Sequence, residues 1–230
     1  MPTEAETYAN HANEYEALIS REDYHGNILK AVQKITRLDG LDVLDLGSGT
    51  GRLACLLVRH VRQVLAFDLS THMLGLARGK LRHFQRENWF VAAADHRWLP
   101  VKPRSADLIV SGWSLSYLAV WNPQRWRLLT EAWLNEADRV LRPRGRIILF
   151  ESLGTGAELP RRLPHLENFY GWLDEQGFES NWIRTDYRFE SSGIADELVG
   201  FFFGEEMKSK IQRKLMTTLP ECTGVWWTRL

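Results

Sequence analysis

Residues 43–51 read VLDLGSGTG, and this stretch decides the fold. An apolar run that meets three glycines spaced two apart, followed by the apolar segment 52–59, is typical of a buried strand, a tight turn and a helix. Glycine permits positive φ and lets a ligand approach the backbone with no Cβ in the way. In doubly wound sheets such a turn lies at the carboxyl ends of the strands, where ligands bind. The stretch therefore predicts an α/β fold with a ligand site at residues 47–51.

The rest of the chain alternates short β-rich runs with longer helical runs. This pattern is typical of a mainly parallel sheet with crossover helices. The expected strands are 41–46, 61–67, 89–93, 107–111, 146–151, 181–189 and 224–228. The expected helices are 52–59, one that opens at Ser70, one from Asn122-Pro123 to about Leu141, 166–176, and 194–215 with breaks at Gly200 and Gly204. Seven strands in 230 residues predict a single domain.

The spacing of the glycines argues against a nicotinamide dinucleotide. The dinucleotide fingerprint places its third glycine three residues after the second, and here that position is Arg52. A nicotinamide-dependent oxidoreductase is therefore a disfavoured alternative.

Two carboxylates follow the next two expected strands. Asp68 ends the second strand and can accept hydrogen bonds from both ribose hydroxyls of a nucleoside. Asp95 follows the third strand and can accept a hydrogen bond from an adenine amino group. Each also has an ordinary interpretation, since Asp68 can cap the helix at Ser70 and Asp95 can be a solvated loop residue. The order and spacing of the glycine turn, Asp68 and Asp95 favour a nucleoside site.

Together these residues resemble the class I S-adenosylmethionine-dependent methyltransferases, especially the small-molecule type with a methyltransferase domain 11-like core. The resemblance covers about residues 41–153 and extends to Leu99-Pro100 and to residues 141–146, LRPRGR. It implies a doubly wound, seven-stranded, mostly parallel Rossmann-like sheet with an antiparallel last strand. It also implies S-adenosylmethionine as cofactor and S-adenosylhomocysteine as product.

The resemblance assigns nine residues to the cofactor. Asp45 and Gly47 are expected to face its methionine half, which the backbone of Ser111 helps to hold, and Gly49 and Gly51 are expected to let the cofactor pass. Asp68 is expected to hold the ribose and Asp95, with the backbone of His96, to bind the adenine edge. Leu69 is the ninth residue expected at the cofactor.

The acceptor is expected beyond the fourth strand, over residues 112–117, GWSLSY. Methyl transfer is an in-line displacement that positioning and the exclusion of water can accelerate, so the sequence names no catalytic residue. The residues expected to touch substrate are Tyr15, Trp113 and Tyr117. Further side chains available there are Tyr8, His11, Tyr24, His25, Trp121 and Phe201 to Phe203, for which ordinary packing is the competing interpretation.

The expected domain has three parts. Residues 1–38 form an N-terminal helical lid, residues 39–153 the cofactor-binding half, and residues 154–230 the substrate-side half with a lid segment at 191–222.

Charge and composition narrow the partners. The chain has 29 Lys and Arg against 29 Asp and Glu, so its net charge is zero, which argues against duplex DNA or an anionic membrane. Two distant cysteines, Cys55 and Cys222, form no disulfide framework and no zinc motif. The polar first thirty residues and the lack of a long apolar run predict a cytoplasmic protein.

The resulting hypothesis is a methyltransferase that acts on O or N, less readily C, of a small molecule and uses no metal. Two more classes remain compatible with the sequence. One is a non-catalytic S-adenosylmethionine-binding or interaction module, and the second is an RNA or protein methyltransferase.

Overall fold

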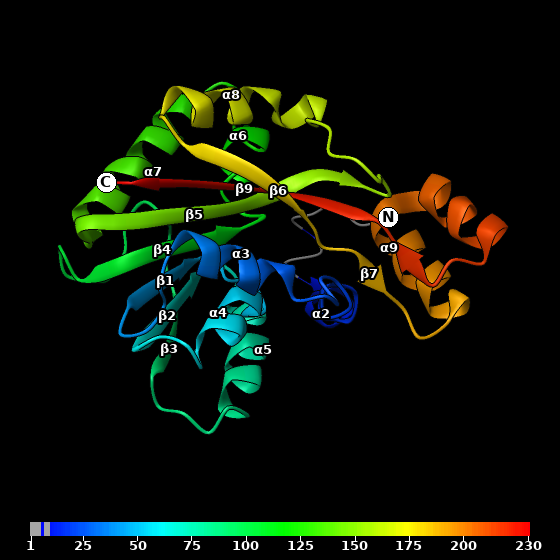
Figure 1. Cartoon of the computed structure of the whole chain (residues 1–230), viewed down its shortest axis with the longest axis horizontal. Helices are drawn as coiled ribbons and strands as arrows, with labels where there is room; N and C mark the ends of the chain where they lie inside the picture. Colours follow the sequence, from blue (N-terminus) through cyan, green and yellow to red (C-terminus); the bar gives the residue numbers. More distant parts are fainter. Residues whose placement is uncertain (1–5, 7–9) are drawn as a thin grey trace.

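The computed structural model describes residue 6 and residues 10–230 (Figure 1). Its main sheet has seven strands in the order β3-β2-β1-β4-β5-β9-β6. They are β1 (Asp42–Leu46), β2 (Gln63–Asp68), β3 (Trp89–Ala93), β4 (Ala106–Gly112), β5 (Leu141–Thr155), β6 (Glu179–Arg184) and β9 (Glu221–Arg229). The pairs from β3 to β5 are parallel, and β9 runs antiparallel to β5 and to β6. The predicted doubly wound sheet with an antiparallel last strand is confirmed.

Helices cover both faces of this sheet (Figure 1). They are α2 (Ala12–Ile19), α3 (Asn27–Ile35), α4 (Arg52–Leu57), α5 (Thr71–Arg82), α6 (Tyr117–Val120), α7 (Trp126–Val140), the short η1 (Pro164–Leu166), α8 (Glu167–Glu175) and α9 (Ser192–Lys214). Successive strand residues point to opposite faces, so Ile147 packs with Trp133 of α7 while Ile148 packs in the cluster that contains Leu53 of α4. The central strands β1 and β4 are buried on both faces and are mostly apolar, whereas the edge strand β6 is largely exposed.

A third apolar cluster lies at one end of the sheet. It joins Leu18 of α2 to Val199 and Ile211 of α9 and to the small hairpin of β7 (Tyr187–Arg188) and β8 (Thr218–Leu219). The described parts of the two expected lid segments therefore pack against the same cluster. Tyr8 lies outside the described residues.

The glycine turn needs its glycines for two reasons. Gly47, Gly49 and Gly51 all have positive φ, at 68°, 52° and 82°, which other residues rarely adopt. A Cβ on Gly51 would lie 2.9 Å from the Cβ of Ala77, so this glycine also lets α5 approach the start of α4.

Two predicted elements were wrong. Asn122 does not cap a helix, because its side chain donates to the Leu118 carbonyl at 3.3 Å and α7 begins only at Trp126. The expected strand 181–189 is divided, because the amide of Thr185 bonds to the Glu221 carbonyl and the chain then turns into β7 of the second sheet. Of the two glycines in α9, only Gly204 breaks the helical conformation.

The close packing at Gly51 can be tested with a pair of glycine variants. We expect Gly51→Ala to lower the free energy of unfolding by about 1–3 kcal/mol, because its Cβ would meet Ala77 at an unfavourable φ. Gly75 is the control, since it is an exposed residue inside α5 with open space beside it. Gly75→Ala should raise the stability by about 0.5–1 kcal/mol. Urea unfolding measures both, and equal effects would contradict the packing described.

Candidate functional site

Asp68 joins the tip of β2 to the glycine turn. Its Oδ2 accepts a hydrogen bond from the amide of Gly49 at 2.8 Å, and its Oδ1 accepts one from the amide of Ser70 at 2.8 Å. A carboxylate has about four lone-pair sites, so both oxygens can still accept hydrogen bonds from a ligand. Ser70 caps α5 with its own hydroxyl, which accepts from the Met73 amide at 3.3 Å. The side chain of Asp68 is therefore held at the turn, where the sequence places it.

The residues expected beside the nucleoside gather next to Asp68. Leu69 is 69% exposed and offers an apolar surface beside that carboxylate. Asp95 accepts from the side chain of Arg97 at 2.8 and 2.6 Å, which lowers the pKa of Asp95. An adenine base bound here would share the carboxylate of Asp95 with Arg97. Partial burial lowers the pKa of His96, whose ring lies 3.0 Å from where a Cβ on Gly47 would be.

Asp45 has a structural partner as well as an unused oxygen. Its Oδ2 accepts from the amide of Ala54 at 2.9 Å in the first turn of α4. Burial and, to a smaller extent, the charge of Asp68 raise the pKa of Asp45 to about 7. The hydrogen bond from the Ala54 amide opposes this shift.

Buried polar atoms at this end of the sheet fit a polar ligand. Within the described residues no hydrogen-bond partner reaches Asp45 Oδ1, Ser48 Oγ, Thr50 Oγ1 or Ser111 Oγ. Such atoms are costly unless something bonds to them. Space beside Gly49 is open, whereas the Ser114 side chain already lies against Gly47. The polar residues and the open position at Gly49 thus fit an amino-acid nucleoside such as S-adenosylmethionine.

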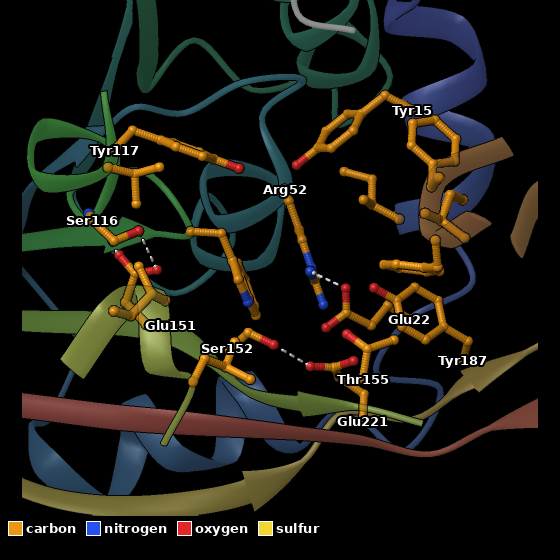
Figure 2. Close-up of a pocket in the computed structure, with 18 of the residues that line it drawn as sticks. Tyr15, Glu22, Arg52, Ser116, Tyr117, Glu151, Ser152, Thr155, Tyr187 and Glu221 are labelled. Carbon is orange, nitrogen blue, oxygen red and sulfur yellow. Dashed lines mark hydrogen bonds and ion pairs between the residues drawn. The ribbon is translucent and has the colours of Figure 1, made fainter. Parts of the chain in front are cut away.

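A cavity of about 610 Å³ lies next to the turn (Figure 2). Two of the residues that line it are Arg52, which directly follows the glycine turn, and Trp113, which directly follows β4. The guanidinium of Arg52 lies over the Trp113 ring, 4.4 Å from its centroid. Trp113 has a φ of 50°, an uncommon value for a bulky residue, and its amide donates to the Phe150 carbonyl at 2.7 Å. The backbone therefore turns sharply to place this ring in the cavity wall.

The three residues expected to touch substrate, Tyr15, Trp113 and Tyr117, all line this cavity. Phe202 and Phe203 of the expected lid segment line it too. The remaining side chains proposed for this region lie elsewhere: His11 packs on Phe201 with ring centroids 5.4 Å apart, Tyr24 stacks on His25 at 4.0 Å, and Trp121 stacks on Tyr117 at 4.6 Å. The residues expected beside the cofactor lie outside this cavity.

Four charged residues of the cavity wall were not predicted from the sequence as part of a substrate site. Glu22 accepts from Arg52 at 2.8 Å in a nearly buried ion pair. Glu221, the first residue of β9, accepts from the Ser152 hydroxyl at 2.7 Å. Figure 2 shows Glu22 and Glu221 on the same side of the cavity as Arg52.

Glu151 is the fourth, on the opposite side from Glu221 in Figure 2. It accepts from the amide and the hydroxyl of Ser116 at 3.1 and 2.9 Å. Its place at the end of the expected strand 146–151 was an available signal, because ligands bind at the carboxyl ends of parallel strands.

The family model and the curated relatives described next are all named for methyl transfer. Residues 44–149 match a family model described as a methyltransferase domain. The chain is 31% identical over 112 residues to a demethylmenaquinone methyltransferase of Tropheryma whipplei, which covers 49% of this chain and 42% of the relative. It is 32% identical over 148 residues to a malonyl-[acyl-carrier protein] O-methyltransferase of Hahella chejuensis, which covers 63% of this chain and 47% of the relative. The chain thus spans less than half the length of these relatives.

The fold also occurs in solved structures. A SAM-dependent methyltransferase from Aquifex aeolicus superposes with a TM-score of 0.55 at 17% identity, covering 86% of this chain and 87% of that one. The resemblance of the sequence to the class I S-adenosylmethionine-dependent methyltransferases is confirmed by this fold and by the family match, in which residues 44–149 correspond to a methyltransferase domain.

Two further findings concern the described residues alone. None of their helices combines the length and the apolar character that a membrane crossing needs. Within the same residues, no three His, Cys, Asp or Glu side chains come together as a metal site. The cytoplasmic location stays a prediction of the sequence.

Burial of Glu151 gives the stability of the fold a defined pH dependence. Burial raises the pKa of this carboxyl from 4.5 to about 7, although the Ser116 hydrogen bonds oppose the shift. A carboxyl whose pKa is raised on folding stabilises the fold below its unfolded pKa and loses this effect as pH rises to the folded value. We expect the stability of the wild type to fall by about 1 kcal/mol per pH unit relative to Glu151→Gln over that interval.

Urea unfolding at about pH 5, 6 and 7 measures this difference. Glu175→Gln, which removes an exposed carboxylate paired with Arg127, is the control and should follow the wild type in this range. Parallel curves for the wild type and Glu151→Gln would contradict a protonated Glu151.

Proposed function

We propose that this protein is an S-adenosylmethionine-dependent methyltransferase that methylates O or N, less readily C, of a small molecule. One observation carries the proposal. The aromatic-walled cavity of about 610 Å³ begins at the two residues that follow the glycine turn and β4, so an acceptor bound there lies next to the cofactor end of the sheet. Its size is that of a small-molecule site.

In this proposal, different residues of the chain bind the cofactor and the acceptor. When bound, S-adenosylmethionine supplies an electrophilic methyl carbon on a positively charged sulfur. Asp68 and the polar atoms near Asp45 hold the cofactor, and Leu69 gives the base an apolar surface. The rings of Trp113 and Tyr117 orient the acceptor and exclude water. Fixing two reactants in line can remove about 7–11 kcal/mol of a barrier, so positioning is sufficient as the main source of rate.

The relatives support methyl transfer more strongly than they support any one acceptor. One is named for demethylmenaquinone and the second for a malonyl group on an acyl-carrier protein. Because these acceptors differ, the acceptor of this chain has to be argued from its own cavity.

The competing functions differ in their expected behaviour in solution. Saturation by NADH without binding of S-adenosylmethionine would identify an oxidoreductase. Cofactor binding without turnover across a broad acceptor panel would identify a binding module. A steep salt dependence of RNA binding would favour an RNA methyltransferase.

The cofactor site is tested by Asp68→Ala. We expect the affinity for S-adenosylhomocysteine to fall by about 1–3 kcal/mol, the scale of losing hydrogen bonds to a charged group. Isothermal titration calorimetry measures this change.

The control must separate binding from folding, because Asp68 also holds Gly49 and Ser70. Asp68→Asn keeps one acceptor oxygen and should lose less affinity than Asp68→Ala. Thermal unfolding of both variants shows whether the turn remains folded. An unchanged affinity in a folded Asp68→Ala variant would count against the cofactor site.

A further inference from the structure

The cavity contains more acidic than basic groups. Its charged and titratable lining includes the carboxyls of Glu22, Glu151 and Glu221, the guanidinium of Arg52 and the imidazole of His165. Arg52 is neutralised by Glu22, with 2.8 Å between Arg52 Nη1 and Glu22 Oε2. Among the described residues, two carboxyls therefore face the cavity without a basic side chain of their own.

The hydrogen bonds of these two carboxyls agree with this shortage of positive charge. Glu151 is held by Ser116 and Glu221 by Ser152, and within residues 10–230 no salt bridge reaches either carboxyl. Glu221 is only 2% exposed, yet its Oε2 has no hydrogen-bond partner in the described chain. A buried, unbonded carboxylate oxygen in a cavity wall is costly unless a ligand pairs with it.

The walls between these carboxyls are aromatic. The rings are those of Tyr15, Trp113, Tyr117, Tyr187, Phe202 and Phe203. Aromatic faces attract cations, and the attraction grows where water is excluded. The carboxyls without basic partners and the aromatic walls therefore both favour a cationic ligand.

We propose that this cavity binds a small molecule that carries an ammonium group, with Glu151 and Glu221 as its charge partners and the aromatic rings as its walls. The inference rests on the proposed function and deepens it, because the methyl acceptor is then an amine. One of the two carboxylates takes the ammonium proton, and the freed nitrogen lone pair bonds the methyl carbon as its bond to sulfur breaks, which leaves S-adenosylhomocysteine. An anionic acceptor would meet the carboxyls of Glu151 and Glu221. Arg52 pairs with Glu22 through its Nη1, and its buried Nη2, which has no partner among the described residues, can donate to a polar group of the ligand.

The pKa values agree with this geometry. Burial and the charge of Glu22 raise the pKa of Glu221 to about 8, although Arg52 lowers it. Asp186 also faces this region, since its Oδ1 accepts from the Glu221 amide at 2.9 Å, and burial raises the pKa of nearby Tyr187.

The titratable neighbour of Glu151 is Tyr170, whose pKa is raised by burial and by the charge of Glu151, and His165 also lines the cavity. A bound cation would favour the ionised form of both carboxyls, so its affinity should rise with pH.

The test uses a probe whose own charge does not titrate. Trimethyl(2-phenylethyl)ammonium is compared by calorimetry with the neutral 2-phenylethanol and the anionic 3-phenylpropanoate. At about pH 8.5 we expect the cation to bind at least about tenfold more tightly than either, by charge pairing and by contact with the rings. Its affinity should fall about tenfold at about pH 6, where both carboxyls are protonated.

Substitution of each carboxyl tests whether Glu151 and Glu221 cause the preference for the cation and its pH dependence. Glu221→Gln and Glu151→Gln should each weaken binding of the cation about tenfold at about pH 8.5 and flatten the pH dependence, whereas 2-phenylethanol should bind each variant like the wild type. Glu175→Gln, an exposed carboxylate on α8 outside the cavity, should bind all three probes like the wild type. Two independent variants keep the test decisive if one of them fails to fold.

Binding of S-adenosylhomocysteine is measured in the same samples. Equal or tighter binding of 3-phenylpropanoate, a cation affinity that neither variant lowers, or no binding of the cation would overturn the amine site. Binding of the cation without binding of S-adenosylhomocysteine would support the cation site and overturn the proposed methyltransferase function.

Discussion

The carboxylate of Asp68 fixes the geometry on which the cofactor side depends. It accepts hydrogen bonds from the Gly49 amide in the turn after β1 and from the Ser70 amide at the start of α5. Both bonds are charge-assisted, and a carboxylate is favourable at the N-terminal end of a helix. The positive φ of Gly49 directs its amide to this carboxylate. One side chain thus holds the turn, the tip of β2 and a helix in a single arrangement.

The acceptor side is assembled differently, from residues far apart in the chain. Glu22 follows α2, Arg52 begins α4, Glu151 lies on β5 and Glu221 begins β9. Because β9 runs antiparallel, its first residue lies at the edge where the parallel strands end, opposite Thr155 of β5. Buried carboxyls without basic partners reduce stability. Glu151 and Glu221 place part of that cost in one cavity, as is usual where function requires a polar group.

The sequence predicts the cofactor side of the site more fully than the acceptor side. The turn, Asp68 and β1 to β4 follow local rules of glycine conformation, apolar runs and capping, and the sequence located them within two residues. The prediction that Asn122 caps a helix was wrong because its side chain donates a hydrogen bond to the Leu118 carbonyl, a contact that no local pattern specifies. Glu22 and Glu221 were missed because they reach the cavity wall that contains Arg52 only when α2 and β9 pack against the sheet. Glu221 also lies three residues before the predicted strand at 224.

The helix α2 connects these two sides. Glu16 pairs with Lys80 of α5 at 2.6 Å, on the cofactor side, while the Tyr15 ring contacts Phe202 of α9 at 6.4 Å between centroids. After the helix, Glu22 pairs with Arg52 beside the glycine turn. Arg52 therefore lies between two parts of the chain that are far apart in the sequence: the glycine turn and the N-terminal segment that lines the cavity. Losing Glu22 would leave a buried guanidinium unpaired, which costs more than losing an exposed ion pair. The same ion pair thus joins the N-terminal segment to the start of α4 and neutralises a guanidinium that would otherwise repel an ammonium group in the cavity.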